Sequence, residues 1–460
     1  MTNYCNKKKK KTIIILFIIF IAVFTACTPL NNIDDTTSLY HSETLGFWQL
    51  HQTENFDFDE LYDIYRELLL EDFDFLENIL LTHLPHLGVF NRRFQISMYE
   101  RLERQRTSIE SGNLMLQREN VNPPERLPRL VSYRFLARLG PLSVNHTHLG
   151  PASRDSLAFY FFFRYHGEEL SSVIDWENSN FRLFYQLDQD DPHVPEPPFN
   201  EGVIQTEVLE PDRIAYISVG RFAFSPAMLL DQEILFDFYE QIQDFEHLII
   251  DLRGNAGGNS LWFSESVVKP LINEPLEFRK YQFIREAILH NDTGDGLITI
   301  FDIDQSTVDF SSSNLELIPA LEFVQTHGMS EFNKDDLSAL DYVMIRTDTL
   351  QPAAVNFDFN GKVWLLVDSR TFSAAENAVL VSLNTGFATV VGTNTGGVMP
   401  SLSAFAILPN TGIAFRFDVG YFVDANGRSL TEFGITPDYL NRPGMNALQT
   451  VLAMIEEMSN

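Results

Sequence analysis

The fold is decided by two short runs, Val-Trp-Leu-Leu-Val at residues 363–367 and Thr-Phe-Ser-Ala-Ala-Glu at residues 371–376. The first run is apolar throughout, which is typical of a strand that is buried on both faces. The second run opens a segment that reads as a helix. A serine placed there, at position 373, lies near free backbone N–H groups and the positive end of the helix. Nucleophilic catalysis favours this setting, because negative charge develops beside the serine in the transition state.

Ser373 and Glu376 also have a purely structural interpretation. Their spacing fits the capping box, in which two side chains satisfy backbone N–H groups at the start of a helix. Such a cap needs no catalytic function, and short motifs also match by chance. The hexapeptide alone therefore leaves both interpretations open.

Strands and helices alternate from residue 203 onward. We expect strands at residues 214–219, 247–251, 363–367 and 388–391, and helices at residues 232–242, 260–268 and 373–383. This alternation predicts an α/β core at residues 203–445, with a mostly parallel sheet covered by helices. Residues 283–345 show no clean period, and we expect an insertion with some helix there.

The chain before residue 203 has a different character. Apolar residues recur at helical spacing, as at Leu61, Ile64 and Leu68, and predict a helical domain at residues 56–140. Residues 141–202 are expected to form a β-rich connecting region. Its strand-like runs lie at residues 157–164 and 181–187, and a loop rich in Asp and Pro follows at residues 188–199.

The first residues are typical of a targeting segment. Five lysines at residues 7–11 precede an apolar run at residues 13–24, and Thr-Ala-Cys follows at residues 25–27. The last residues resemble a bacterial lipobox, in which the cysteine is lipidated and becomes the mature N-terminus. We therefore expect a lipoprotein signal peptide at residues 1–26, lipidation of Cys27, and a tether at residues 27–55. The alternative is an ordinary secretory signal followed by a coincidental cysteine.

Composition excludes several kinds of partner. The formal net charge of the chain is −30, and loss of the five leader lysines would bring it to about −35. Phosphate binding needs a basic surface, so we expect no nucleic-acid partner. Direct adhesion to anionic lipid is disfavoured for the same reason, which leaves the lipid anchor as the expected membrane tether. The cysteines are Cys5 and Cys27, and removal of the first with the signal would leave no intrachain disulfide.

A second motif lies at residues 248–259, which read Leu-Ile-Ile-Asp-Leu-Arg-Gly-Asn-Ala-Gly-Gly-Asn. A buried strand ends at Asp251, and a glycine-rich turn leads into the next segment. Such a turn lets backbone N–H groups approach an oxyanion, but a tight structural turn or a phosphate loop would explain it equally well. The spacing matches neither a Walker loop nor a dinucleotide fingerprint, so nucleotide binding is not expected.

Taken together, four blocks of the sequence resemble the C-terminal processing (tail-specific) and tricorn core peptidases. The blocks are Asn145–Leu149, Asp251–Gly258, Thr371–Glu376 and Glu432–Asp438. The resemblance implies a serine peptidase with a crotonase-like ββα core, and the helical region at residues 56–140 resembles the N-terminal cap of that family.

Two departures place the chain nearer the tricorn-like branch. The tail-specific branch activates its serine with a lysine about 25 residues downstream, in a Gly-Lys-Gly context. Residues 391–397 contain no lysine here, and no lysine follows Lys362. A PDZ-like segment is not recognisable at residues 155–212. The resemblance therefore implies a histidine base and an acidic partner, since a histidine has an unperturbed pKa near the working pH.

The resemblance also implies a role for individual residues. Ser373 is the nucleophile, His146 is the base, and Glu432 is a distal acidic member that acts through an intervening polar residue. The oxyanion-hole N–H groups come from Gly257 and Ala374. Asn145 stands where tricorn-like proteins have a serine, and it is the expected relay residue.

His148 is an alternative base, because His146 and His148 share one face of a strand. The same two histidines could instead be metal ligands, but the sequence offers no third ligand cluster. We therefore expect neither a metal nor a cofactor.

These observations predict a lipid-anchored serine-type peptidase that is secreted across the cytoplasmic membrane. It would hydrolyse peptides or unfolded protein segments at the cell envelope. The alternative is an inactive binding lipoprotein that retains the peptidase fold, with Asn145 as the sign of lost activity. A crotonase-fold enzyme for small acyl substrates is a third interpretation, which the serine block and the secretion signal disfavour.

Overall fold

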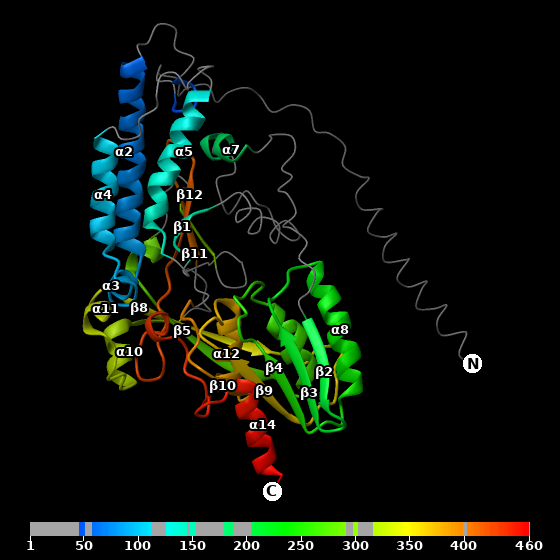
Figure 1. Ribbon diagram of the computed structural model, residues 1–460. Helices are drawn as coiled ribbons and strands as arrows, with labels where there is room; N and C mark the ends of the chain where they lie inside the picture. The colour runs from blue at the N-terminus through cyan, green and yellow to red at the C-terminus, as the bar shows by residue number, and fades with distance from the viewer. Residues whose placement is uncertain are drawn as a thin grey trace, which may run out of the picture. The chain divides into compact units, whose positions relative to one another are not determined.

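The computed structural model describes residues 46–50, 58–111, 126–144, 148–152, 179–186, 204–290, 298–301, 316–398 and 403–459 (Figure 1). The expected signal peptide, Cys27, Asn145 and His146 lie outside these residues. Residues Gly46–Asn460 form one compact unit. Among the described helices, none has the length and apolar character needed to cross a membrane.

A six-stranded sheet carries the core, in the order β13-β10-β9-β4-β3-β2. Its strands are β2 (Ile204–Glu210), β3 (Ile214–Val219), β4 (His247–Asp251), β9 (Lys362–Val367), β10 (Thr389–Gly392) and β13 (Tyr439–Leu440). All neighbouring pairs from β3 to β13 are parallel, whereas β2 runs antiparallel to β3. The predicted α/β class and mostly parallel sheet are therefore confirmed (Figure 1).

Helices cover both faces of this sheet. They include α8 (Ala227–Gln241) and α12 (Ala374–Thr385) on one face and α14 (Ala447–Met458) on the other. Because successive strand residues point to opposite faces, Leu365 packs on the first side and both Trp364 and Leu366 pack on the second. These side chains are fully buried, each contributing about 2 kcal/mol of hydrophobic stabilisation. Burial on both faces explains why the strand sequences are continuously apolar.

A second, four-stranded sheet packs with the N-terminal helices in a common core. Its order is β1 (Gly150–Pro151), β12 (Ala414–Asp418), β11 (Ser403–Ile407) and β6 (Ile298–Phe301). The helices are α2 (Phe58–His83), α3 (Leu87–Phe94), α4 (Met98–Glu110) and α5 (Leu127–Leu139), and they lie where the helical domain was expected. Phe73 of α2, Phe135 of α5 and Phe415 of β12 are all fully buried in this core.

Several local predictions need correction. The run at residues 181–187 is not a strand, because Ser179–Tyr185 forms helix α7. Its aromatic residues Phe181, Phe184 and Tyr185 are all buried, and their spacing of three and four places them on one helical face. The strand-like run at residues 157–164 lies outside the described residues. The helix expected at residues 260–268 is a π-helical segment, η6 (Ser264–Val268), followed by α9 (Lys269–Leu271).

The region without a clean period contains a third sheet. Strands β5 (Leu276–Ile284), β8 (Tyr342–Leu350) and β7 (Glu316–Pro319) pair antiparallel in that order, and α10 (Ala320–Thr326) and α11 (Lys334–Ser338) accompany them. The described part of this region thus contains the expected helix, in α10 and α11, together with strands that the sequence did not indicate. Part of the expected tether is also ordered, because Phe47 is buried with its ring centroid 4.9 Å from that of Tyr65.

Candidate active site

Ser373 is held in a strained backbone conformation between β9 and α12. Its φ of 53° and ψ of −125° lie in a region that residues with a side chain rarely adopt, at a cost on the order of 1–3 kcal/mol. The Ser373 side chain makes no capping hydrogen bond to the helix. The capping-box interpretation is therefore wrong, and the hydroxyl is available for other contacts.

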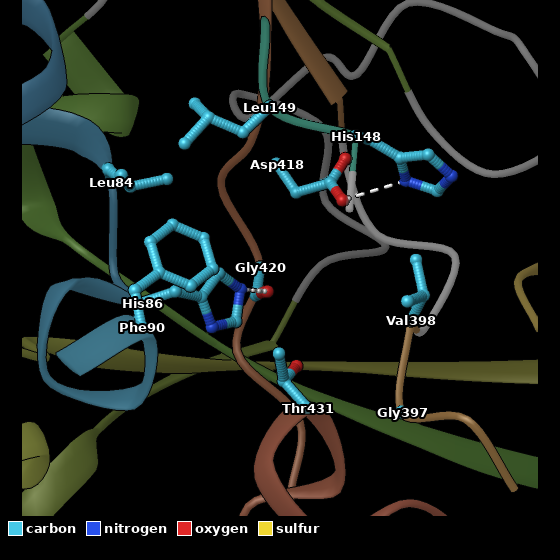
Figure 2. Close-up of a pocket in the computed structure, with 10 residues that line it drawn as sticks. All are labelled: Leu84, His86, Phe90, His148, Leu149, Gly397, Val398, Asp418, Gly420 and Thr431. Atoms are coloured by element: carbon cyan, nitrogen blue, oxygen red, sulfur yellow. Dashed lines mark hydrogen bonds and ion pairs between the residues drawn. The ribbon is translucent and has the colours of Figure 1, made fainter. Parts of the chain in front are cut away.

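The Ser373 hydroxyl faces a histidine that is itself bonded to a carboxylate. Ser373 Oγ lies 3.4 Å from His148 Nε2, and His148 Nδ1 lies 2.8 Å from Asp418 Oδ2. Figure 2 shows the His148 ring beside the Asp418 carboxylate. When Nδ1–H donates to Asp418, Nε2 is left as the acceptor for the serine proton. The first distance is at the long end of the range for a hydrogen bond.

Strand pairing explains how His148 reaches Asp418. In the antiparallel pair of β1 and β12, Gly150 is opposite Arg416 and Pro151 is opposite Phe415. If this register is continued by two residues beyond β1, His148 comes opposite Asp418, in agreement with the 2.8 Å contact between their side chains. Opposed side chains in an antiparallel pair share one face and lie close together. The side chains are partly buried, with exposed fractions of 18% for His148 and 13% for Asp418.

The glycine-rich turn after β4 lies against Ser373. Gly257 has a φ of 94°, and a Cβ atom there would lie 2.9 Å from the Ala374 nitrogen and from Ser373 Cβ. A side chain at position 257 would therefore collide with the loop that carries Ser373. Asn255 fastens the turn, because its carbonyl oxygen accepts a hydrogen bond of 3.0 Å from the Phe372 N–H.

The hydrogen bonds of the same turn determine which N–H groups are free to donate to an oxyanion. The Gly257 N–H is already bonded to Asn255 Oδ1 at 2.8 Å, so this predicted donor is occupied. In the part of the chain that the structure describes, the N–H groups of Gly258 and Ala374 have no hydrogen-bond partner. Ala374 is also the first residue of α12, where the helix dipole favours negative charge.

Glu432, the predicted acidic member, lies in an ion pair with Arg92. Arg92 Nε lies 3.1 and 3.0 Å from the two carboxylate oxygens, and Nη2 lies 2.8 Å from Oε2. These hydrogen bonds, together with those to Asp336, raise the pKa of Arg92. Asp418 is thus the carboxylate that contacts His148, whereas Glu432 contacts Arg92. Asp418 was missed by sequence reasoning, although it ends an alternating run, Ala414–Asp418.

Two cavities lie near these elements. One of about 20 Å³, roughly the volume that holds a single water molecule, is lined by His148 and Asp418 (Figure 2). A larger one of about 510 Å³ runs along α12 and β5, and Ser373, His148 and Asp418 are not among its lining residues. Within the described ranges, no group of three or more His, Cys, Asp or Glu side chains could hold a metal ion.

The sequence itself matches a known family over its core. Residues 213–440 match the sequence model of peptidase family S41. The chain carries a peptidase domain of family S41. This domain contains Ser373 and Asp418, whereas His148 precedes it. The protein is therefore a serine-type peptidase by family, as the sequence resemblance implied.

Solved structures with related chains were also found. A protein from Parabacteroides merdae ATCC 43184, described as a peptidase, is 18% identical with a TM-score of 0.39, covering 76% of this chain and 88% of its own. The photosystem II D1 C-terminal processing protease is 15% identical with a TM-score of 0.32, covering 56% and 53%. Mature CPAF in complex with lactacystin is 19% identical with a TM-score of 0.32, covering 53% and 50%. The S41 chain thus spans about half the length of the last two, and the family assignment rests on residues 213–440.

Proposed function

We propose that this S41 chain hydrolyses peptide bonds in peptides or unfolded protein segments, with Ser373 as nucleophile, His148 as general base and Asp418 as the carboxylate that orients His148. The observation that carries the proposal is the continuous contact from Ser373 Oγ through the imidazole to Asp418. This proposal replaces the expected base His146 and the expected acidic member Glu432.

In the acylation step, Ser373 Oγ attacks the scissile carbonyl carbon while its proton moves to His148 Nε2. Asp418 keeps the Nδ1–H tautomer in place and stabilises the imidazolium that forms. The tetrahedral oxyanion would accept hydrogen bonds from the Ala374 N–H and the Gly258 N–H, since the Gly257 N–H is occupied. The intermediate then collapses, the peptide C–N bond breaks, and His148 returns its proton to the leaving amine. A water molecule then attacks the acyl carbon while His148 Nε2 accepts its proton. The ester bond to Ser373 Oγ breaks, His148 returns the proton to Oγ, and the carboxylic acid product leaves.

A fluorophosphonate probe tests the nucleophile directly. We expect the probe to modify Ser373, and we expect Ser373→Ala to abolish both labelling and hydrolysis of an unfolded protein substrate. Circular dichroism of the variant checks that the fold is intact. Labelling at a different serine, or unchanged hydrolysis by Ser373→Ala, would refute the proposal.

We also propose that the core is crotonase-like and that helices α2 to α5 form its N-terminal cap. Support comes from the order of β3, β4 and the following helical segment η6, and from the shared core of these helices with β11 and β12. A lipid anchor at Cys27 and a place at the cell envelope complete the proposal, and they rest on the leader sequence. Mass spectrometry of the mature N-terminus tests the anchor, and an unmodified Cys27 would contradict it.

A further inference from the structure

Arg93 reaches from α3 to a short segment beside the nucleophile. Its guanidinium Nη2 donates to the carbonyl of Gly396, and Nη1 donates to the carbonyls of Gly397, at 3.1 Å, and Thr431. The segment Gly396–Val398 follows β10 and precedes β11. A side chain of the N-terminal helices is therefore bonded to backbone close to the catalytic serine.

Glu376 of α12 binds the same segment from the other side. Its carboxylate, fully buried, accepts hydrogen bonds of 2.7 Å from the N–H groups of Gly397 and Val398. It also accepts a bond of 2.5 Å from Thr395 Oγ1. Glu376 lies one helical turn after Ser373, so the catalytic helix itself holds the segment.

The two side chains clamp successive peptide groups. In the peptide group between Gly396 and Gly397, and again in the next one, the carbonyl binds Arg93 and the N–H binds Glu376. The following carbonyl, Val398 O, accepts a hydrogen bond of 2.7 Å from the Ser373 N–H. A short path of hydrogen bonds therefore runs from α3 to the strained backbone of the nucleophile.

The segment is built for these contacts. Gly397 has a φ of 78°, and a Cβ atom there would collide with Arg93 Nη1 and with the Leu430 carbonyl. Burial lowers the pKa of the Arg93 guanidinium, and the carboxylates of Glu376 and Glu432 act in the opposite direction. The Arg93 guanidinium nevertheless stays charged, because its ordinary pKa lies far above neutral pH.

We propose that Arg93 is a positioning residue for Ser373, acting with Glu376 through the Gly396–Val398 segment. When the clamp holds the Val398 carbonyl in place, the Ser373 N–H keeps its hydrogen bond to that carbonyl. The serine then stays in its positive-φ conformation, with Oγ directed toward His148. The inference rests on the proposed role of Ser373. It adds that the N-terminal helices take part in organising the site, although they supply none of the Ser373–His148–Asp418 side chains.

The test measures the rate of fluorophosphonate labelling at Ser373 together with kcat and KM for peptide hydrolysis. We expect Arg93→Met to lower the labelling rate and kcat by about tenfold or more, because small displacements of a nucleophile are costly, while KM changes little. Arg93→Lys should show an intermediate rate, since an ammonium can bind only part of the carbonyl set. The matched control is Arg129→Met, because Arg129 also donates to backbone carbonyls, those of Leu183 and Phe184, at a different place.

The outcomes separate this inference from the proposed function. If wild-type Ser373 is not labelled, the proposed function fails. If wild type is labelled and folded Arg93→Met reacts at the wild-type rate, the positioning role is overturned while the function stands. An equal loss in Arg129→Met would also overturn it. Should Arg93→Met not fold, Arg93→Lys decides, and a wild-type labelling rate in that variant would contradict the inference.

Discussion

At the scale of single residues, the proposed site depends on the Asp418 carboxylate, which lies 2.8 Å from His148 Nδ1. The place of Ser373 between a strand and a helix was predictable because its signal is local, a buried strand followed directly by a helix start. The proximity of Asp418 to His148 was not predictable, because the two residues lie 270 positions apart in the chain and are brought together by the pairing of β1 with β12. Glu432 was predicted by its block, but Arg92 from an N-terminal helix occupies it. Such long-range pairings leave no spacing pattern in a sequence.

The two carboxylates should differ in their effect on catalysis. We expect Asp418→Asn to reduce kcat/KM on the order of 10³-fold, because the amide favours the wrong imidazole tautomer and cannot stabilise the imidazolium. Glu432→Gln should reduce it much less, since Glu432 contacts Arg92. Steady-state hydrolysis of a quenched peptide by both variants gives the comparison, and a larger loss in Glu432→Gln would restore the sequence-based assignment.

The strain at Ser373 predicts a difference between two inactive variants. Glycine adopts positive φ without steric cost, whereas alanine retains the strain of the native serine. We therefore expect Ser373→Gly to be more stable than Ser373→Ala by about 1 kcal/mol, despite the greater entropy of glycine in the unfolded chain. Urea unfolding of the two proteins measures the difference. Equal stability, or a more stable alanine variant, would show that the backbone at position 373 is not strained.

At the scale of elements, the central sheet was predictable and the connecting regions were not. Strands such as β4 and β9 are buried on both faces, so their apolar runs mark them clearly in the sequence. The aromatic residues of α7 are equally typical of a strand. The helix is decided by which side chains the fold buries, namely Phe181, Phe184 and Tyr185 on one face. The segment Gly396–Val398 has no regular structure and is specified by Arg93 and Glu376 instead.

Glu376 should make stability depend on pH. Burial raises its pKa from 4.5 to about 7, although hydrogen bonds from Thr395, Gly397 and Val398 act against the shift. A carboxyl group with a raised pKa in the folded state stabilises most below pH 4.5, and this contribution is lost as pH rises through about 7. Relative to Glu376→Gln, the wild-type free energy of unfolding should fall by about 3 kcal/mol over that range. Urea unfolding of both proteins from pH 4.5 to 8 measures this difference, and a constant or rising difference would contradict it.

At the scale of the whole molecule, polar contacts join the N-terminal helices to the peptidase core. Arg92 and Arg93 of α3 bind Asp336, Glu432 and the backbone beside Ser373. Asp72 of α2 binds the turn before β12, accepting bonds of 2.9 and 2.6 Å from the N–H and hydroxyl of Thr411. The sequence showed the helical region and the core separately, but not the charge pairs that connect them.

Arg92 should contribute more to stability than a comparable surface arginine. Arg92→Met would leave Asp336, whose side chain is 2% exposed, without its ion-pair partner. We expect a loss of about 2 kcal/mol, below the full cost of breaking a buried pair because Arg92 is 30% exposed. Arg442→Met is the control, since Arg442 pairs with exposed Glu457 and its loss should change stability little. Equal urea midpoints for the two variants would show that the Arg92 cluster is not stabilising.

The most direct test of the proposed site compares the two histidines of the sequence block. Peptide hydrolysis is measured as kcat/KM for wild type, His148→Ala and His146→Ala, with circular dichroism to confirm folding. We predict that His148→Ala loses on the order of 10²-fold or more, the scale of a missing general base, whereas His146→Ala stays close to wild type. The opposite pattern, with activity lost in His146→Ala and kept in His148→Ala, would contradict the Ser373–His148–Asp418 assignment.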